Sequence, residues 1–168
     1  DQLVTTATER SFAGLYDALH RLYAQENGKV RWGEKSPRNC FWMDEIKRDF
    51  PDAQFVHIVR DGRDMAIDIA NSPPMVPNNL YSGAQIWKAY NRAALDSAAR
   101  MDGKSYYKIH YEALCNDPQK ELRGLCQFLR EDFDEAMLSH DKSPAAQTWS
   151  KIANHANVGR SITTEYCE

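Results

Sequence analysis

The chain has 168 residues, 42% of them hydrophobic and 27% charged, which is the balance of a globular protein with one hydrophobic core. Its formal net charge of -3 excludes a strongly basic surface of the kind that binds nucleic acid or anionic membranes. No apolar stretch has the length of a membrane span. The cysteines form no CxxC pair, so zinc and a disulfide framework are disfavoured and free thiols in a reducing compartment are expected; they are Cys40, Cys115, Cys126 and Cys167.

In the first third of the chain the sequence predicts two helices with a short strand between them. Apolar residues recur at helical spacing over 8–26, and Asn27 with the following glycine ends that helix. Lys29–Glu34 is a strand candidate. A second helix over 39–49 is stopped by a proline.

The middle of the chain contains an apolar run with many β-branched residues, Gln54–Val59. Such a run predicts a strand that is buried on both faces of a parallel sheet. The charged segment 60–64 ends the strand, and helical character resumes over 65–71. Strand, polar turn and helix in this order form half of a βαβ unit.

The remaining elements alternate in the same way after a surface loop at 73–79, where three prolines exclude a regular helix. They are a helix over 80–101, a strand over 105–110, a helix from Asp117 onward, and two helical pieces over 132–157 that divide near Ser143. The sequence therefore predicts a single α/β domain over residues 1–168.

Three predicted strands end in residues suited to binding an anionic nucleotide: Lys35, Arg60 and Tyr111. Ligands of open parallel sheets bind beyond the carboxyl ends of the strands, where free N–H groups of helix N-termini favour phosphate. Each residue also has an ordinary interpretation. The charges of 60–64 pair with one another, Lys35 is a surface lysine, and Tyr111 packs against the end of its strand.

Three segments together resemble the middle of sulfotransferases that use 3′-phosphoadenosine 5′-phosphosulfate. They are Trp32–Pro37, Phe50–Asp64 and His110–Leu114, in the right order within residues 30–140. The resemblance is closer to the bacterial and Golgi-type branches than to the cytosolic phenol and steroid enzymes. It implies a three-layer, P-loop-like fold, with a parallel sheet flanked by helices, that is incomplete at both ends.

The resemblance also implies roles for single residues. Arg60 matches the arginine that grips the 3′-phosphate of the donor, and Tyr111 lies in the segment that lines the adenine pocket. Lys35 matches the lysine beside the bridging oxygen of the phosphosulfate. The implied co-substrate is 3′-phosphoadenosine 5′-phosphosulfate, without a metal. The implied acceptor is a hydroxyl or amine of a small molecule, glycan or peptide.

The sequence departs from the family pattern at two places. Asp68 stands where the family has a serine that contacts the 3′-phosphate, and Asn71 or Ser72, on the same helix face, are alternatives. The Gly-rich phosphate loop and the C-terminal nucleotide-closing segment have no counterpart. We therefore expect a fragment of a larger enzyme whose sheet is completed by another segment or subunit.

Several points stay open at this stage. No general base is assigned, although His110 and His155 are candidates. The loop at 73–79, Tyr81 and Trp87 are either walls of an acceptor site or ordinary surface. A bacterial cytoplasmic location is expected. The alternatives to a sulfotransferase are an inactive nucleotide-binding or interaction module of the same fold, and a related P-loop kinase.

Overall fold

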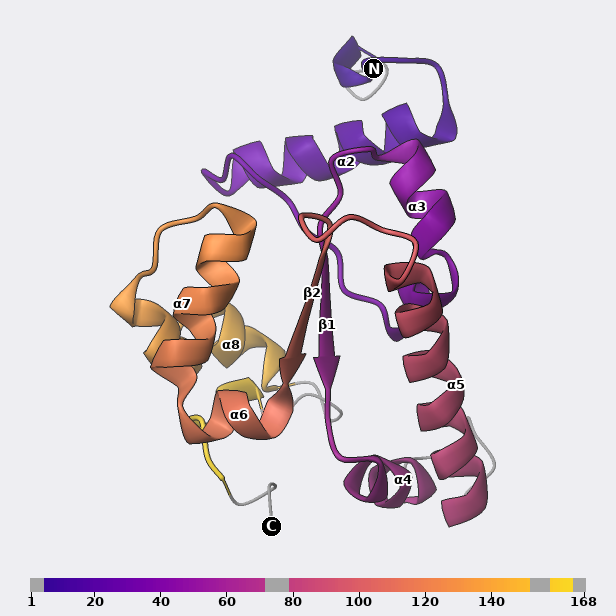
Figure 1. Cartoon of the computed structure of the whole chain (residues 1–168). Helices are drawn as coiled ribbons and strands as arrows, with labels where there is room; N and C mark the ends of the chain where they lie inside the picture. The colour runs from indigo at the N-terminus through magenta and orange to yellow at the C-terminus, as the bar shows by residue number, and fades with distance from the viewer. Residues whose placement is uncertain (1–4, 72–78, 152–157, 165–168) are drawn as a thin grey trace. The chain divides into compact units, whose positions relative to one another are not determined.

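The computed structural model describes residues 5–71, 79–151 and 158–164, which belong to two compact units, Asp1–Ala53 and Gln54–Glu168 (Figure 1). The prediction of one domain over residues 1–168 stays a prediction. No helix of the described residues is long and apolar enough to cross a membrane. Cys40, Cys115 and Cys126 are free thiols, and Cys167 lies outside the described residues.

The first unit contains the helix α2 (Phe12–Glu26), a 3-10 helix η1 (Pro37–Phe41) and the helix α3 (Met43–Asp49). The side chain of Ser11 accepts a hydrogen bond from the N–H of Gly14 and so caps the start of α2. The chain leaves α2 through Gly28, whose φ of 64° is the left-handed conformation that glycine adopts at little cost. The predicted long helix and its end are thereby confirmed, with a start at Phe12.

An aromatic cluster forms the core of this unit. The ring of Trp32 lies edge-on to Phe50 with centroids 5.9 Å apart, and it also contacts Tyr16 and His20. Its indole N–H donates to Asp17 at 3.0 Å. The prediction of a strand at Lys29–Glu34 is wrong. This segment pairs with no strand of the described chain, and Val30 is fully exposed, because the segment is anchored by the Trp32 ring rather than by a sheet.

The second unit is built on two parallel strands, β1 (Phe55–Val59) and β2 (Tyr106–His110), which pair in register from Phe55 with Tyr106 to Val59 with His110. Both strands were predicted from the sequence, and both are confirmed. Because the two strands run parallel, their carboxyl ends lie together at one end of the sheet (Figure 1).

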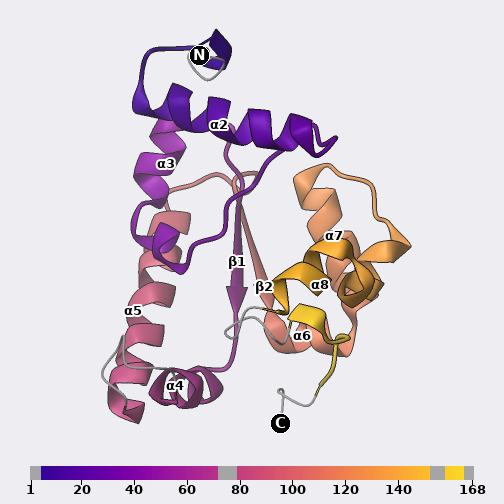
Figure 2. The same cartoon turned by 180° about the vertical axis from the view of Figure 1, so that it is seen from behind.

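Helices cover the two faces of this strand pair (Figures 1 and 2). After β1 the chain forms α4 (Gly62–Ala70) and α5 (Leu80–Ala98) on one face. After β2 it forms α6 (Tyr111–Asn116) and α7 (Pro118–Leu129) on the other. His57 of β1 contacts Asn91 of α5, and the ring of Tyr107 in β2 stacks on Phe128 of α7 with centroids 5.2 Å apart. The result is a three-layer α/β arrangement.

The tail of the second unit consists of a 3-10 helix η2 (Glu135–Lys142) and the helix α8 (Pro144–Trp149). The side chain of Ser143 caps α8 by accepting from the N–H of Ala146, so the predicted division near this serine is confirmed. The predicted loop at 73–79 lies outside the described residues except for Asn79, which caps α5.

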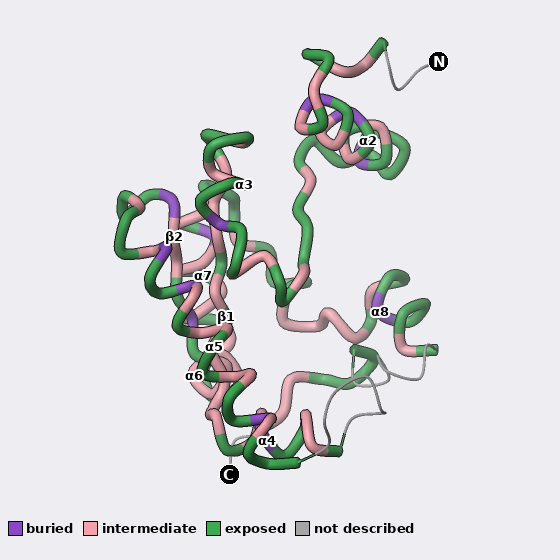
Figure 3. The backbone as a smooth tube through the Cα atoms, turned by 90° about the vertical axis from the view of Figure 1, so that its right-hand side faces the viewer, coloured by how far each residue is buried: buried purple, intermediate pink, exposed green. Residues whose placement is uncertain are grey.

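Burial in this unit is uneven. Ile109 of β2 is only 2% exposed, whereas its registered neighbour Ile58 in β1 is 57% exposed. Figure 3 shows β1 without any buried position. The prediction that this strand is buried on both faces is therefore wrong, because α7 packs over β2 and leaves Val56 and Ile58 of β1 exposed on the same face.

Candidate nucleotide-binding site

Arg60 stands at the first position after β1, where the chain turns into α4. The turn is held by contacts from two other helices. The indole N–H of Trp87 in α5 donates to the carbonyl oxygen of Arg60 at 2.9 Å. The N–H of Asp61 donates to a carboxylate oxygen of Glu112 in α6 at 2.7 Å. The backbone position of Arg60 is therefore fixed from both sides of the sheet.

The start of α4 is stabilised by Asp61. Its carboxylate accepts from the backbone N–H of Arg63 at 2.7 Å and pairs with the Arg63 guanidinium at 2.8 Å. These hydrogen bonds from the Arg63 side chain and backbone lower the pKa of Asp61 to about 2. Part of the charged turn is thus self-paired, as the ordinary interpretation of segment 60–64 expected.

The side chain of Arg60 is mostly covered and lies within a cluster of three partners. Its guanidinium contacts the Asp68 carboxylate at 2.5 Å and the Asp64 carboxylate at 3.5 Å. The guanidinium carbon also lies over the ring of Tyr111, 5.4 Å from the ring centroid. Burial opposes the charge of Arg60, but the hydrogen bond and charge of Asp68, with Asp64 and Tyr111, outweigh it and raise the pKa of the guanidinium.

The structure brings together three of the four residues that the sequence singled out. Arg60 and Tyr111 meet because each follows directly on one of two neighbouring parallel strands, and Asp68 contacts Arg60 from the second turn of α4. Lys35 belongs to the first unit. It is exposed there, in the extended segment before η1. The roles that the resemblance gives these residues stay predictions.

The remaining candidates lie in different surroundings. Asn71 is exposed at the end of α4, while Ser72 and His155 lie outside the described residues. His110 is exposed at the end of β2 and precedes α6. In the described part of the chain, no group of three or more His, Cys, Asp or Glu residues is placed to hold a metal ion.

The sequence did not predict the contacts that three residues make with Arg60 or its turn: Asp64, Trp87 and Glu112. Asp64 carried a detectable signal, because it lies four residues after Arg60 and thus on the Arg60 side of a helix that begins at once. Trp87 and Glu112 contact the turn from distant positions in the chain, and only the packing of α5 and α6 brings them there.

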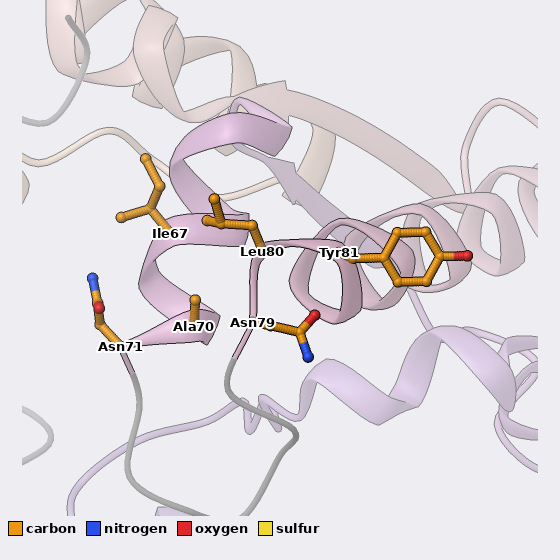
Figure 4. A pocket seen from close by; sticks show the side chains of 6 residues that line it. All are labelled: Ile67, Ala70, Asn71, Asn79, Leu80 and Tyr81. Carbon is orange, nitrogen blue, oxygen red and sulfur yellow. The ribbon is translucent and has the colours of Figure 1, made fainter.

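Two open hollows lie between α4 and α5. One is lined by residues from the end of α4 and the start of α5: Ile67, Ala70, Asn71, Asn79, Leu80 and Tyr81 (Figure 4). The other reaches the Arg60 turn, since Asp61, Gly62 and Trp87 line it together with Leu80 and Lys88. Tyr81 and Trp87, named above as acceptor-side candidates, therefore each border a hollow, and Leu80 borders both.

Comparison with known proteins supports a single family. The sequence model of the sulfotransferase family matches residues 3–135. Protein-tyrosine sulfotransferase A of Caenorhabditis elegans is 27% identical over 143 residues, which are 79% of this chain and 36% of that protein.

Two solved structures share the architecture. The sulfotransferase domain of the Synechococcus PCC 7002 olefin synthase superposes with a TM-score of 0.73 at 26% identity, over 92% of this chain and 57% of that one. The sulfotransferase domain from the curacin biosynthetic pathway has a TM-score of 0.61 at 19% identity, over 99% of this chain and 65% of that one.

The chain thus spans between 36% and 65% of the length of these three relatives. The two superpositions confirm the P-loop-like α/β fold that the sequence predicted. The family match covers most of the chain and includes both strands and the whole Arg60 cluster. This chain belongs to the sulfotransferase family.

Proposed function

We propose that this protein transfers a sulfuryl group from 3′-phosphoadenosine 5′-phosphosulfate to a hydroxyl or amine of an acceptor. The observation that carries the proposal is the position of Arg60. In a chain of the sulfotransferase family, a covered guanidinium is held at the carboxyl end of β1 and lies over the ring of Tyr111. This arrangement suits a nucleotide that presents both a phosphate and an aromatic base.

Arg60 is the proposed ligand of the 3′-phosphate. A guanidinium offers several N–H groups in fixed directions, so it binds phosphate oxygens in a defined geometry. The backbone of Arg60 is hydrogen-bonded to Trp87, and the backbone of Asp61, the next residue, is hydrogen-bonded to Glu112. The turn is therefore already ordered, and a bound nucleotide loses less affinity to ordering it. Tyr111, on the neighbouring strand end, is the proposed adenine-side residue.

Lys35 is the proposed residue at the leaving group. In the transfer the acceptor oxygen or nitrogen forms a bond to sulfur, and the bond from sulfur to the bridging oxygen breaks. The electron pair stays on the 5′-phosphate of the departing nucleotide, and the acceptor loses its proton to a base. An ammonium group beside the bridging oxygen stabilises the negative charge that develops there.

The relatives indicate which class of acceptor to test first. The Caenorhabditis elegans relative is a protein-tyrosine sulfotransferase, so a tyrosine peptide is the first acceptor to test. The hollows bordered by Leu80, Tyr81 and Trp87 are the proposed acceptor side, since one of them reaches the Arg60 turn and both are partly apolar.

A nucleotide-binding module without transfer activity is the second candidate. The specific observation in its favour is the ion pair between Arg60 and Asp68. In this pair a carboxylate already holds the guanidinium that is proposed to bind the phosphate.

The proposal is tested by calorimetric titration of the chain with 3′-phosphoadenosine 5′-phosphate, adenosine 5′-phosphate, and ATP with magnesium. Tightest binding of the 3′-phosphorylated nucleotide is expected. Arg60→Ala should weaken that binding by about ten- to a hundredfold, as for a lost hydrogen bond to a charged group. Arg92→Ala, which removes an exposed arginine of α5, is the matched control and should leave the affinity unchanged.

Transfer is measured separately with radiolabelled donor and a tyrosine peptide. Binding with transfer supports the enzyme, and binding without transfer to any hydroxyl or amine acceptor supports the inactive module. Equal affinity for the nucleotides with and without the 3′-phosphate, unaffected by Arg60→Ala, would overturn both.

A further inference from the structure

We propose that Asp68 is an internal competitor for the nucleotide: its carboxylate occupies Arg60 in the free protein and must leave when a 3′-phosphate binds. This inference rests on the proposed function, because it concerns the affinity of the same site. It assigns to Asp68 the task of weakening donor and product binding, rather than of contacting the nucleotide.

The geometry shows why Arg60 and Asp68 are partners in the free protein. Asp64 and Asp68 lie one turn apart on α4, on the same side of the helix, where two carboxylates repel each other. Arg60 contacts both, at 3.5 Å and 2.5 Å, and so relieves the repulsion. The closer contact, to Asp68, is made by one terminal nitrogen of the guanidinium, a group that a phosphate oxygen would also use.

The charge balance of the cluster is unfavourable for an anion. Arg60 supplies one positive charge, while Asp64 and Asp68 supply two negative charges, so the cluster as a whole repels a phosphate. Moving the Asp68 carboxylate away from the guanidinium exposes the positive charge and lowers the local negative charge at the same time.

The two carboxylates differ in how easily they can move. The side chain of Asp64 is 24% exposed and is held near the start of α4, close to Arg60 in the chain. The Asp68 side chain, one turn further along the same face of the helix, is 58% exposed. A water-facing carboxylate loses little when it turns to solvent, because more than half of its surface is already hydrated. Asp68 is therefore the partner that yields to the ligand, and Asp64 stays.

The expected consequence is a nucleotide affinity that is set below what Arg60 alone would give. The 3′-phosphate must displace the Asp68 carboxylate from Arg60, and the displaced carboxylate still repels a phosphate that carries two charges. At about 6 Å in water, this repulsion alone lowers affinity about tenfold. Asp68→Asn keeps the size and polarity of the side chain and removes this charge. We expect it to tighten binding of 3′-phosphoadenosine 5′-phosphate about tenfold or more, while leaving adenosine 5′-phosphate, which lacks the 3′-phosphate, unchanged.

The experiment compares titrations of the wild-type chain, Asp68→Asn and Asp68→Ser with both nucleotides. Asp96→Asn is the matched control. Asp96 is another exposed aspartate, 63% exposed, that faces an arginine on its own helix at 3.7 Å, and its replacement should leave both affinities unchanged. Circular dichroism establishes that each variant is folded. If Asp68→Asn does not fold, Asp68→Ser, which also removes the charge, replaces it in the comparison.

A further variant separates competition from simple repulsion. In an Arg60→Ala background the gain from Asp68→Asn should be smaller, because no guanidinium is left to compete for and only the repulsion between the carboxylate and the phosphate remains. A gain of the same size in that background overturns the competitor role and leaves only long-range repulsion. Unchanged or weaker binding of the 3′-phosphorylated nucleotide by both Asp68 variants also overturns it. If the wild-type chain still prefers that nucleotide in an Arg60-dependent way, the proposed function stands. If neither the wild-type chain nor any variant prefers the 3′-phosphorylated nucleotide, the proposed function fails together with the competitor role of Asp68.

Discussion

The indole N–H of Trp87 donates a 2.9 Å hydrogen bond to the backbone carbonyl of Arg60, which ties the middle of α5 to the end of β1. The same ring lies against the turn itself. A Cβ atom added to Gly62 would come within 3.0 Å of the indole, so a residue without a side chain allows the ring and the backbone to approach closely. Trp87 thereby supports the conformation of Arg60, the residue proposed to bind the 3′-phosphate.

Trp87→Phe should test this support, since phenylalanine keeps an aromatic ring and removes the N–H. The Arg60 carbonyl would lose its donor, and the smaller ring would pack less well against the turn. We expect a loss of about 1–2 kcal/mol in the free energy of unfolding, measured by urea denaturation, together with weaker nucleotide binding. Trp42→Phe, at a tryptophan that is 59% exposed, should change stability by less than about 0.5 kcal/mol. Equal losses in the two variants would contradict the supporting role.

The uneven burial of the strand pair gives a second prediction. Ile109 and Ile58 are the same residue type, registered on neighbouring strands and on one face of the sheet. Ile109→Ala should destabilise the chain by about 2–5 kcal/mol, because it leaves a cavity in the core. Ile58→Ala should cost only about 1 kcal/mol, the range of β-propensity differences. Chemical denaturation measures both, and a large loss at Ile58 would mean that another segment or subunit covers β1.

Local sequence patterns were sufficient for much of the second unit. The apolar run before Arg60 predicted β1, and the run before Tyr111 predicted β2. The rule that ligands bind at the carboxyl ends of parallel strands then singled out Arg60 and Tyr111, and the structure places the Arg60 guanidinium over the Tyr111 ring. These successes depend on signals that act within one element.

The errors have physical causes that are not local. An apolar run indicates a strand but not which of its faces is covered, and Val56 and Ile58 are left exposed by the placement of α7. The extended segment before Lys35 has no strand to pair with among the described residues, since its tryptophan packs into the aromatic cluster instead. The short helix α6 was missed because its six residues lie between a strand and a strong helix start at Asp117. The pairing of Arg60 with Asp68 needs the actual course of α4, although both residues had been singled out.

The contact between α4 and α5 gives a third prediction, at Gly83. Within a helix, alanine is favoured over glycine by about 1 kcal/mol, so helix propensity alone predicts that Gly83→Ala stabilises the chain. A Cβ atom at this position would, however, lie 2.6 Å from the backbone carbonyl oxygen of Ala66 in α4, which cannot move aside cheaply. Overpacking of this kind costs about 1–3 kcal/mol, and α4 carries the Asp64 and Asp68 partners of Arg60. We therefore expect a lower Tm and altered nucleotide affinity.

The control for this prediction is Gly103→Ala. No heavy atom lies within 4 Å of a Cβ added there, and its backbone is not in the left-handed region. A Tm within about one degree of the wild-type value is expected for a surface change of this size. A rise in Tm for Gly83→Ala would show that the two helices separate at little cost.

His57 gives the fourth prediction, on the pH dependence of stability. Its imidazole lies between Tyr106, whose hydroxyl is 2.6 Å away, and Asn91, whose side-chain oxygen is 3.1 Å away. Burial lowers the pKa of His57 below 6.5, the nearby charges of Lys108 and His110 act in the same direction, and the hydrogen bond with Asn91 opposes them in part. The folded chain therefore favours the neutral ring.

The sign of the effect follows from proton binding. Between the lowered pKa of the folded state and 6.5, the unfolded chain binds more protons at this residue than the folded chain does, so stability rises with pH. The contribution of neutral His57 is fully present above pH 6.5 and is lost as the pH falls through the folded pKa. His57→Gln, which cannot titrate, should flatten the dependence of the urea midpoint on pH between about 5 and 7 relative to the wild-type chain. His140→Gln on η2, outside the strand pair, is the control and should preserve the slope that His57 produces. An unchanged slope in His57→Gln would show that the half-buried imidazole of His57 does not govern the stability of this unit in that pH range.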